Sequence, residues 1–148
     1  MFNTTIKMMG AVRVSIKLKN AVDEELISRG LLAPRLLREV EVTGLVDTGA
    51  VSLVIPQDIA TQLGLRILRQ KVAEFANGNQ QTIGVTSAIT VEWEDRATTD
   101  EALVVGNEVL IGQVILEKLD LLVDCTNHKL IPNPANPNYP VAMIKQFL

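Results

Sequence analysis

Apolar and polar residues alternate with a period of two over much of the chain, which is typical of half-buried β-strands. One run becomes fully apolar at Leu45 and Val46, which indicates a strand that passes from the surface into a core. Another long run is regular except at Ser87. On this pattern, strands are predicted at residues 12–19, 40–46, 82–93, 102–105, 109–111 and 121–123.

Two short helices are predicted between these strands. The first covers residues 56–64, because Pro56 suits the first helical position, Asp58 suits the positive amino-terminal end and Gly64 suits the stop. The second covers residues 113–119, where apolar residues have helical spacing. Ile59, Leu63 and Leu65 have the same spacing as Ile115, Leu119 and Leu121, and each set follows an apolar strand that ends in glycine. This weak internal repeat indicates two similar halves.

The remaining segments lack a regular period. Residues 21–37 are interrupted by Gly30 and Pro34, and we expect a long loop there with room for one helical turn. Prolines alternate with asparagine and alanine in residues 132–140, which favours an extended, non-helical course. The chain as a whole is therefore expected to be mainly β.

The composition is that of one globular domain built from aliphatic residues. Of the 148 residues 47% are apolar and only 3% aromatic, so residues 1–148 are interpreted as a single domain with an aliphatic core. A net charge of −3 without a basic run argues against nucleic acid as a partner. One histidine and one cysteine are too few for a zinc cage, so no metal or cofactor is expected. No apolar run approaches the ~18 residues of a membrane span, and a cytoplasmic protein is the simplest interpretation.

The tripeptide Asp47-Thr48-Gly49 is the strongest candidate for chemistry. Aspartate and glycine are ordinary turn residues, so the tripeptide alone is compatible with a simple turn. Its position favours a functional role, because the carboxylate directly follows the apolar pair Leu45-Val46. A charge at the mouth of a core is costly, and Asn or Ser would be tolerated there more easily.

The motifs, taken in order, resemble those of the retropepsin-like aspartic proteases, the group that includes the retroviral proteases. Asp47-Thr48-Gly49-Ala50 is followed by an apolar strand, a proline-led helix and a Leu-Gly-Leu triplet at residues 63–65. A second half presents two apolar residues and a glycine before a helix, at residues 110–112. The segment at residues 119–124 is similar to bacterial members of the group.

This resemblance covers residues 11–134 and leaves residues 135–148 as a carboxy-terminal tail. It implies a mainly β, retropepsin-like acid protease fold: a closed barrel-like domain with two short helices and a flap hairpin. It also implies an aspartic endopeptidase, in which a water molecule between two carboxylates hydrolyses peptide bonds of extended polypeptides.

The chain offers one Asp-Thr-Gly motif, and two carboxylates about 3 Å apart are needed to share one proton. A homodimer with one Asp47 from each subunit meets this need. In the family the residue matching Thr48 bonds across the two-fold axis, and Gly49 lets the backbone pass beneath the carboxylates. Residues 2–6 and 141–148 are expected at the dimer interface.

The flap implied by the resemblance is assigned to the turn at Ala76, Asn77, Gly78 and Asn79, because Asn-Gly is a strong hairpin signal. This tip is more polar than the apolar, glycine-rich tips of the retroviral proteases. The pocket walls are expected to favour apolar residues beside the scissile bond. They are assigned to Leu53, Ile55, Ile83, Val85 and Ile111.

A second interpretation keeps the same fold without useful turnover, as a non-catalytic module for peptide binding or dimerisation. The intact motif at Asp47 favours the enzyme, and the polar hairpin tip favours the module. Other candidates are expected to be structural. Asp124 should close a strand, Cys125 should be buried, and His128 and the acidic run at residues 23–25 should face solvent.

Overall fold

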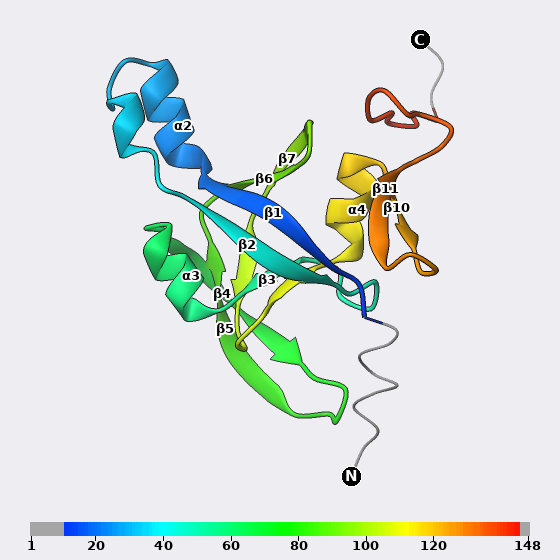
Figure 1. The fold of residues 1–148 in the computed structure, drawn as a ribbon. Helices are drawn as coiled ribbons and strands as arrows, with labels where there is room; N and C mark the ends of the chain where they lie inside the picture. The colour runs from blue at the N-terminus through cyan, green and yellow to red at the C-terminus, as the bar shows by residue number, and fades with distance from the viewer. Residues whose placement is uncertain (1–10, 146–148) are drawn as a thin grey trace.

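The fold is given by a computed structural model that describes residues 11–145. Within these residues, nine strands form the main sheet and two form a separate hairpin, with three α-helices and one 3-10 helix between them. Figure 1 shows their arrangement. The strands are β1 (Arg13–Asn20), β2 (Glu39–Val46), β3 (Leu53–Ile55), β4 (Ile67–Glu74), β5 (Gln80–Thr86), β6 (Ile89–Trp93), β7 (Arg96–Asp100), β8 (Ala102–Val104), β9 (Val109–Ile111), β10 (Leu121–Asp124) and β11 (Lys129–Pro132). The helices are α2 (Ala21–Ser28), α3 (Gln57–Gln62), α4 (Gln113–Leu119) and the 3-10 helix η1 (Pro34–Leu36).

The main sheet has the hydrogen-bonded order β4-β5-β8-β3-β9-β2-β1-β6-β7. Most neighbours are antiparallel, but β2 runs parallel to β9 and β3 runs parallel to β8. These two parallel pairs lie at the centre of the sheet order, where strands from the two halves of the chain meet. The mainly β fold class is confirmed, while closure of the sheet into a barrel stays a prediction.

The core is aliphatic, as the composition predicts. Leu18 from β1, Leu53 from β3 and Ile89 from β6 are completely buried, and they pack in one cluster with the inner faces of α3 and α4. Trp93 is partly buried against this cluster. Both helices predicted from the sequence are present, and each covers the core with isoleucine or leucine.

The long loop expected at residues 21–37 is wrong in its first part, which forms the helix α2. The Asn20 side chain caps this helix by accepting a hydrogen bond of 3.0 Å from the Asp23 N–H. Asp23 is only 2% exposed, so the expectation that the acidic run faces solvent is also wrong at this residue. The helix carries a buried carboxylate on its inner face, and this hides the amphipathic pattern.

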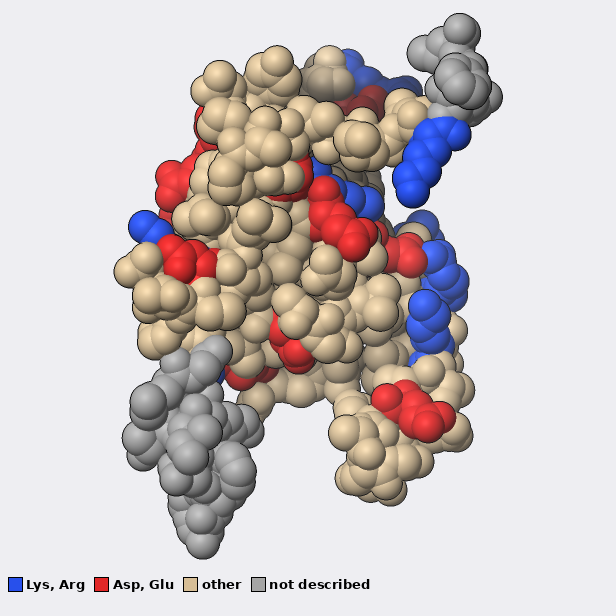
Figure 2. Space-filling model, turned by 90° about the vertical axis from the view of Figure 1, so that its right-hand side faces the viewer, with Lys and Arg blue, Asp and Glu red and all other residues tan. Residues whose placement is uncertain are grey.

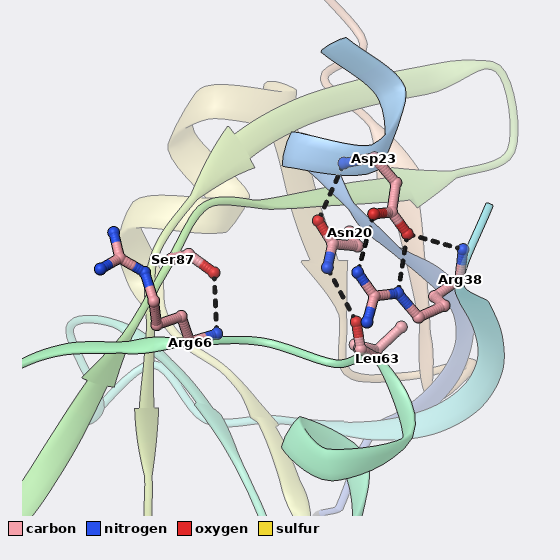
Figure 3. A network of polar contacts seen from close by, with 6 residues as sticks. All are labelled: Asn20, Asp23, Arg38, Leu63, Arg66 and Ser87. Carbon is pink, nitrogen blue, oxygen red and sulfur yellow. Dashed lines mark hydrogen bonds and ion pairs between the residues drawn. The ribbon is translucent and has the colours of Figure 1, made fainter. Parts of the chain in front are cut away.

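A polar network explains how Asp23 is accommodated (Figure 3). Arg38 donates to its carboxylate through Nε at 2.9 Å and Nη2 at 2.8 Å, and the Arg38 backbone N–H adds a third bond of 3.0 Å. These hydrogen bonds hold the pKa of Asp23 below its ordinary value. Asn20 Nδ2 also donates to the Leu63 carbonyl oxygen at 2.9 Å. The network therefore ties α2 to the segments that precede β2 and follow α3.

Other departures from the sequence pattern are smaller. The run predicted at residues 82–93 is two strands, β5 and β6, which part at the irregular position Ser87. Strands β7 and β11 were not predicted, and β4 was implied only as the first arm of the predicted hairpin. Cys125 is exposed, so its predicted burial is wrong, whereas His128 is exposed as expected. No helix in the described part of the chain is long and apolar enough to cross a membrane.

Candidate active site

Asp47 stands at the carboxyl end of β2, beside β9. The two strands are parallel with Val46 opposite Ile111, and the Asp47 N–H donates to the Ile111 carbonyl oxygen at 3.0 Å. The chain then turns sharply, because the Ala50 N–H donates back to the Asp47 carbonyl oxygen at 3.0 Å. The acid is therefore positioned by strand pairing and not by a flexible loop alone.

The carboxylate itself is held within the turn. Asp47 Oδ1 accepts a hydrogen bond of 3.0 Å from the Gly49 N–H. Asp47 and Ala50 are partly buried, whereas Thr48 and Gly49 are exposed. Val51, the next residue, is 67% exposed despite being apolar. The acid thus lies at a surface formed by the exposed turn and an uncovered aliphatic side chain.

At Gly112 the second half of the chain packs directly against this turn. A Cβ atom at Gly112 would lie 2.4 Å from the Ser52 carbonyl oxygen, and under 3 Å from the carbonyl oxygens of Val51 and Ala50. The close approach allows the amides at the start of α4 to reach the turn. Gln113 N–H donates to the Ala50 carbonyl oxygen at 2.8 Å, and Val114 N–H donates to that of Val51 at 3.1 Å. The two loops that follow the glycine-ended strands of the sequence repeat therefore contact each other, and one of them carries Asp47.

The hairpin predicted around Asn77 and Gly78 is present, and its two arms are the antiparallel strands β4 and β5. Its turn is closed by a hydrogen bond of 2.9 Å from the Phe75 N–H to the Asn79 carbonyl oxygen and one of 2.9 Å from the Gly78 N–H to the Phe75 carbonyl oxygen. Gly78 has a φ of +84°, which favours glycine. All four predicted tip residues, Ala76 to Asn79, are exposed. The hairpin projects from the sheet (Figure 1), as a flap would.

A cavity of about 200 Å³ joins the start of this hairpin turn to the sheet. Three of its apolar residues are Phe75 from the hairpin, Val54 from β3 and Leu110 from β9. The loop between β8 and β9 completes the lining with Val105, Gly106, Asn107 and Glu108. Leu110 directly precedes Ile111, whose carbonyl oxygen binds the Asp47 amide. The cavity is therefore adjacent to the strand that positions the acid.

The structure places the five residues predicted as pocket walls in the interior of the domain. Leu53 and Ile55 are 0% exposed and Ile111 is 1% exposed, all within the core cluster. Ile83 and Val85 are also buried, at 4% and 1% exposed. Successive side chains of a strand point to opposite faces. The intervening residues Val54 and Leu110 are therefore the ones that line the cavity.

The other acidic candidate, Asp124, is held by local hydrogen bonds. Asp124 ends β10 as predicted, and its carboxylate accepts hydrogen bonds from the backbone and side chain of Asn127, which lower its pKa. Within residues 11–145, no group of three or more His, Cys, Asp and Glu residues is placed to hold a metal ion. On the face shown in Figure 2, acidic and basic side chains form small separate groups divided by uncharged surface.

Comparison with known proteins agrees with this geometry. The model of the family described as "gag-polyprotein putative aspartyl protease" matches residues 36–118, which is more than half of the chain. The match includes the Asp47 turn, the hairpin, the cavity and nearly all of α4. No curated protein matches the chain at a significant level.

Two solved structures are similar to the chain at low identity. A retropepsin-like aspartic protease from Rickettsia conorii is 21% identical, with a TM-score of 0.42, and the match covers 57% of this chain and 67% of that one. The retroviral protease-like domain of Ddi1 from Leishmania major is 19% identical, with a TM-score of 0.49, and the match covers 73% of this chain and 90% of that one. On the family match over residues 36–118, the chain belongs to the gag-polyprotein putative aspartyl proteases, and the retropepsin-like aspartic protease family expected from its motifs is confirmed.

Proposed function

We propose that the protein is a homodimeric aspartic endopeptidase in which each subunit supplies one Asp47. The carrying observation is the turn that holds this residue: its backbone is fixed by Ile111 and its carboxylate oxygen by the Gly49 N–H. A preorganised acid at a surface is what general acid–base chemistry requires.

The chemistry needs two such acids. One carboxylate takes a proton from water while the other donates a proton to the peptide carbonyl oxygen, and the pair must hold one proton between them. A second copy of the chain supplies the second Asp47. The exposed turn at Thr48 and Gly49 and the exposed Val51 support an interface at this place, because a partner would cover the apolar side chain.

The substrate is an extended polypeptide. Between the hairpin and the sheet it would lie as an added strand, with alternate side chains entering pockets. The cavity lined by Phe75, Val54 and Leu110 supports this proposal, because it joins the hairpin to the strand beside Asp47. We place the enzyme in the cytoplasm, where an exposed, unpaired thiol such as Cys125 is kept reduced.

The termini form the second part of the dimer proposal. Residues 2–6 and 146–148, which were expected at the interface, lie outside the described residues. Within the described part, Met143 and Ile144 are 85% and 71% exposed. The Val141 N–H donates to Asp120 at 3.1 Å, so the tail leaves the domain from a defined anchor.

The first experiment is the substitution Asp47→Asn, measured on a mixed peptide library. The variant keeps the shape of the side chain but loses the base and the shared proton, and each such step contributes on the order of 10²–10⁴-fold. We expect a folded protein without hydrolysis. Cleavage near the wild-type rate would overturn the aspartic mechanism. A chelator added to the wild type should have no effect.

The second experiment tests the shared site. Specific activity should fall on dilution below the dimer dissociation constant, with the mass measured at each point. Excess Asp47→Asn subunits mixed into wild type should suppress activity beyond simple dilution, because mixed dimers lack one carboxylate. Constant specific activity in a sample shown to be monomeric would rule out the two-subunit site.

The alternative is a non-catalytic peptide-binding or dimerisation module, which the exposed polar tip at Asn77 and Asn79 favours. A polar tip gains little by closing over an apolar substrate. This alternative predicts peptide binding by the wild type that is unchanged in Asp47→Asn, with no hydrolysis in either.

A further inference from the structure

We propose that the cavity between Phe75 and Leu110 selects a lysine or arginine side chain of the substrate, whose charged end pairs with Glu108. This inference rests on the proposed peptidase function and names the substrate class of the same site. It replaces the purely apolar preference expected from the sequence.

The body of the cavity suits an aliphatic stem. At about 200 Å³ it is smaller than the roughly 300–1,000 Å³ of pockets that hold a whole small-molecule ligand. Its size is therefore suited to a single side chain. Phe75, Val54, Val105 and Leu110 supply apolar walls, against which the methylene groups of lysine or arginine can pack.

Glu108 places a negative charge at this cavity. It lies in the loop directly before β9, and its side chain lines the same cavity as Leu110. Among the described residues that line the cavity, Glu108 is the one that carries a charge. Lysine and arginine bury their stems while they keep the charged end in water, and a half-exposed carboxylate is the matching partner.

Glu108 is available because its present partner holds it weakly. Arg13 donates to Glu108 Oε1 through Nη2 at 3.1 Å and through Nε at 3.3 Å. The two side chains are 46% and 40% exposed, and exposed ion pairs contribute little. A substrate cation seated in the cavity can therefore displace Arg13 or share the carboxylate with it. An acidic substrate side chain would meet Glu108 as a like charge.

The test uses paired peptides that differ at one position, lysine in one and norleucine in the other. The position is varied over three residues on each side of the cut. For the wild type at low salt, we expect kcat/KM to favour lysine at one position by about three- to fivefold, the range of a half-exposed ion pair. This preference should shrink at high salt, because the charges are partly exposed.

Two variants move the preference in opposite directions. Glu108→Gln should abolish it, and Arg13→Gln should increase it, because the competing cation is gone. Glu101→Gln is the matched control: Glu101 is 41% exposed and paired with Arg69, and it does not line the cavity. The control should keep the wild-type preference.

The outcomes separate this inference from the proposed function. If peptides are cut but the lysine preference is absent, or is the same in Glu108→Gln, the inference is wrong and the peptidase stands. If no peptide is cut, the proposed function fails. The ratio of dissociation constants for the two peptides, from fluorescence anisotropy, then tests the cavity alone. Absence of both cleavage and selective binding overturns the inference.

Discussion

Replacement of Gly112 by alanine tests whether the contact between its loop and the Asp47 turn holds that turn in place. Gly112 has φ −82° and ψ 175°, which any residue adopts, so alanine adds no backbone strain. The added methyl group would lie 2.4 Å from the Ser52 carbonyl oxygen, and contacts under 3.0 Å are essentially never seen for a Cβ atom. The turn must therefore move away from α4.

Two effects of the added methyl group lower the free energy of unfolding. Overpacking costs about 1–3 kcal/mol, and here the atoms that must yield are backbone carbonyls and not flexible side chains. The shift also weakens the hydrogen bonds from Gln113 to Ala50 and from Val114 to Val51, each worth about 0.5–1.5 kcal/mol. We expect the free energy of unfolding to fall by about 3 kcal/mol in total. At about 2–4 °C per kcal/mol for a chain near this size, the melting temperature should drop by about 10 °C.

The assay is urea unfolding followed by circular dichroism, with amide hydrogen exchange at Gln113 and Val114. Both amides should exchange faster in the variant. Gly30→Ala is the control, because Gly30 has a φ of +74° but nothing within 4 Å of an added Cβ. It should cost only the left-handed backbone penalty of about 1–2 kcal/mol. A loss in Gly112→Ala no greater than in the control would refute the argument.

Three further predictions concern pH and buried charge. The pKa of Asp23 is lowered by its hydrogen bonds from Arg38, so its contribution to stability is present above pH ~4 and is lost as pH falls through the lowered pKa. Asp23→Asn should cost about 2 kcal/mol at neutral pH and flatten the loss of stability below pH ~4; an unchanged acid unfolding curve would contradict this. Activity against pH should be bell-shaped, because only a singly protonated carboxylate pair works. A pH profile with a single titration step would refute this expectation. Arg96 is 3% exposed and donates to the carbonyl oxygens of Leu119, Asp120 and Asn136. The ammonium group of lysine cannot replace the planar set of N–H donors of arginine, so Arg96→Lys should lose part of these hydrogen bonds. Because the bond to Asn136 holds the tail, limited proteolysis should then cut the segment after Asn136 faster than in wild type.

Local patterns in the sequence determined the position of the acid and much of the secondary structure. The helices α3 and α4 were predictable because cap residues and apolar spacing act within one or two turns. The hairpin tip was predictable because a glycine at positive φ and an asparagine are local requirements of a turn. Asp47 was recognisable from its motif and from the apolar strand before it.

Contacts between distant residues decided the rest. The helix α2 was missed because its inner face carries Asp23, and the partner Arg38 lies fifteen residues away. The burial of Arg96 could not be predicted for the same reason, since the carbonyl oxygens that accept its hydrogen bonds come from the end of α4 and from the tail.

The sequence did not reveal that the residues predicted as pocket walls are buried in the core, because Leu53, Val54 and Ile55 are consecutive apolar residues. Without a polar residue in the run, the sequence does not show which alternate positions face inward. The sequence by itself therefore determined where the acid lies and which segments surround it. Only the tertiary structure decided which faces of those segments meet, because burial depends on strand pairing between residues far apart in the chain.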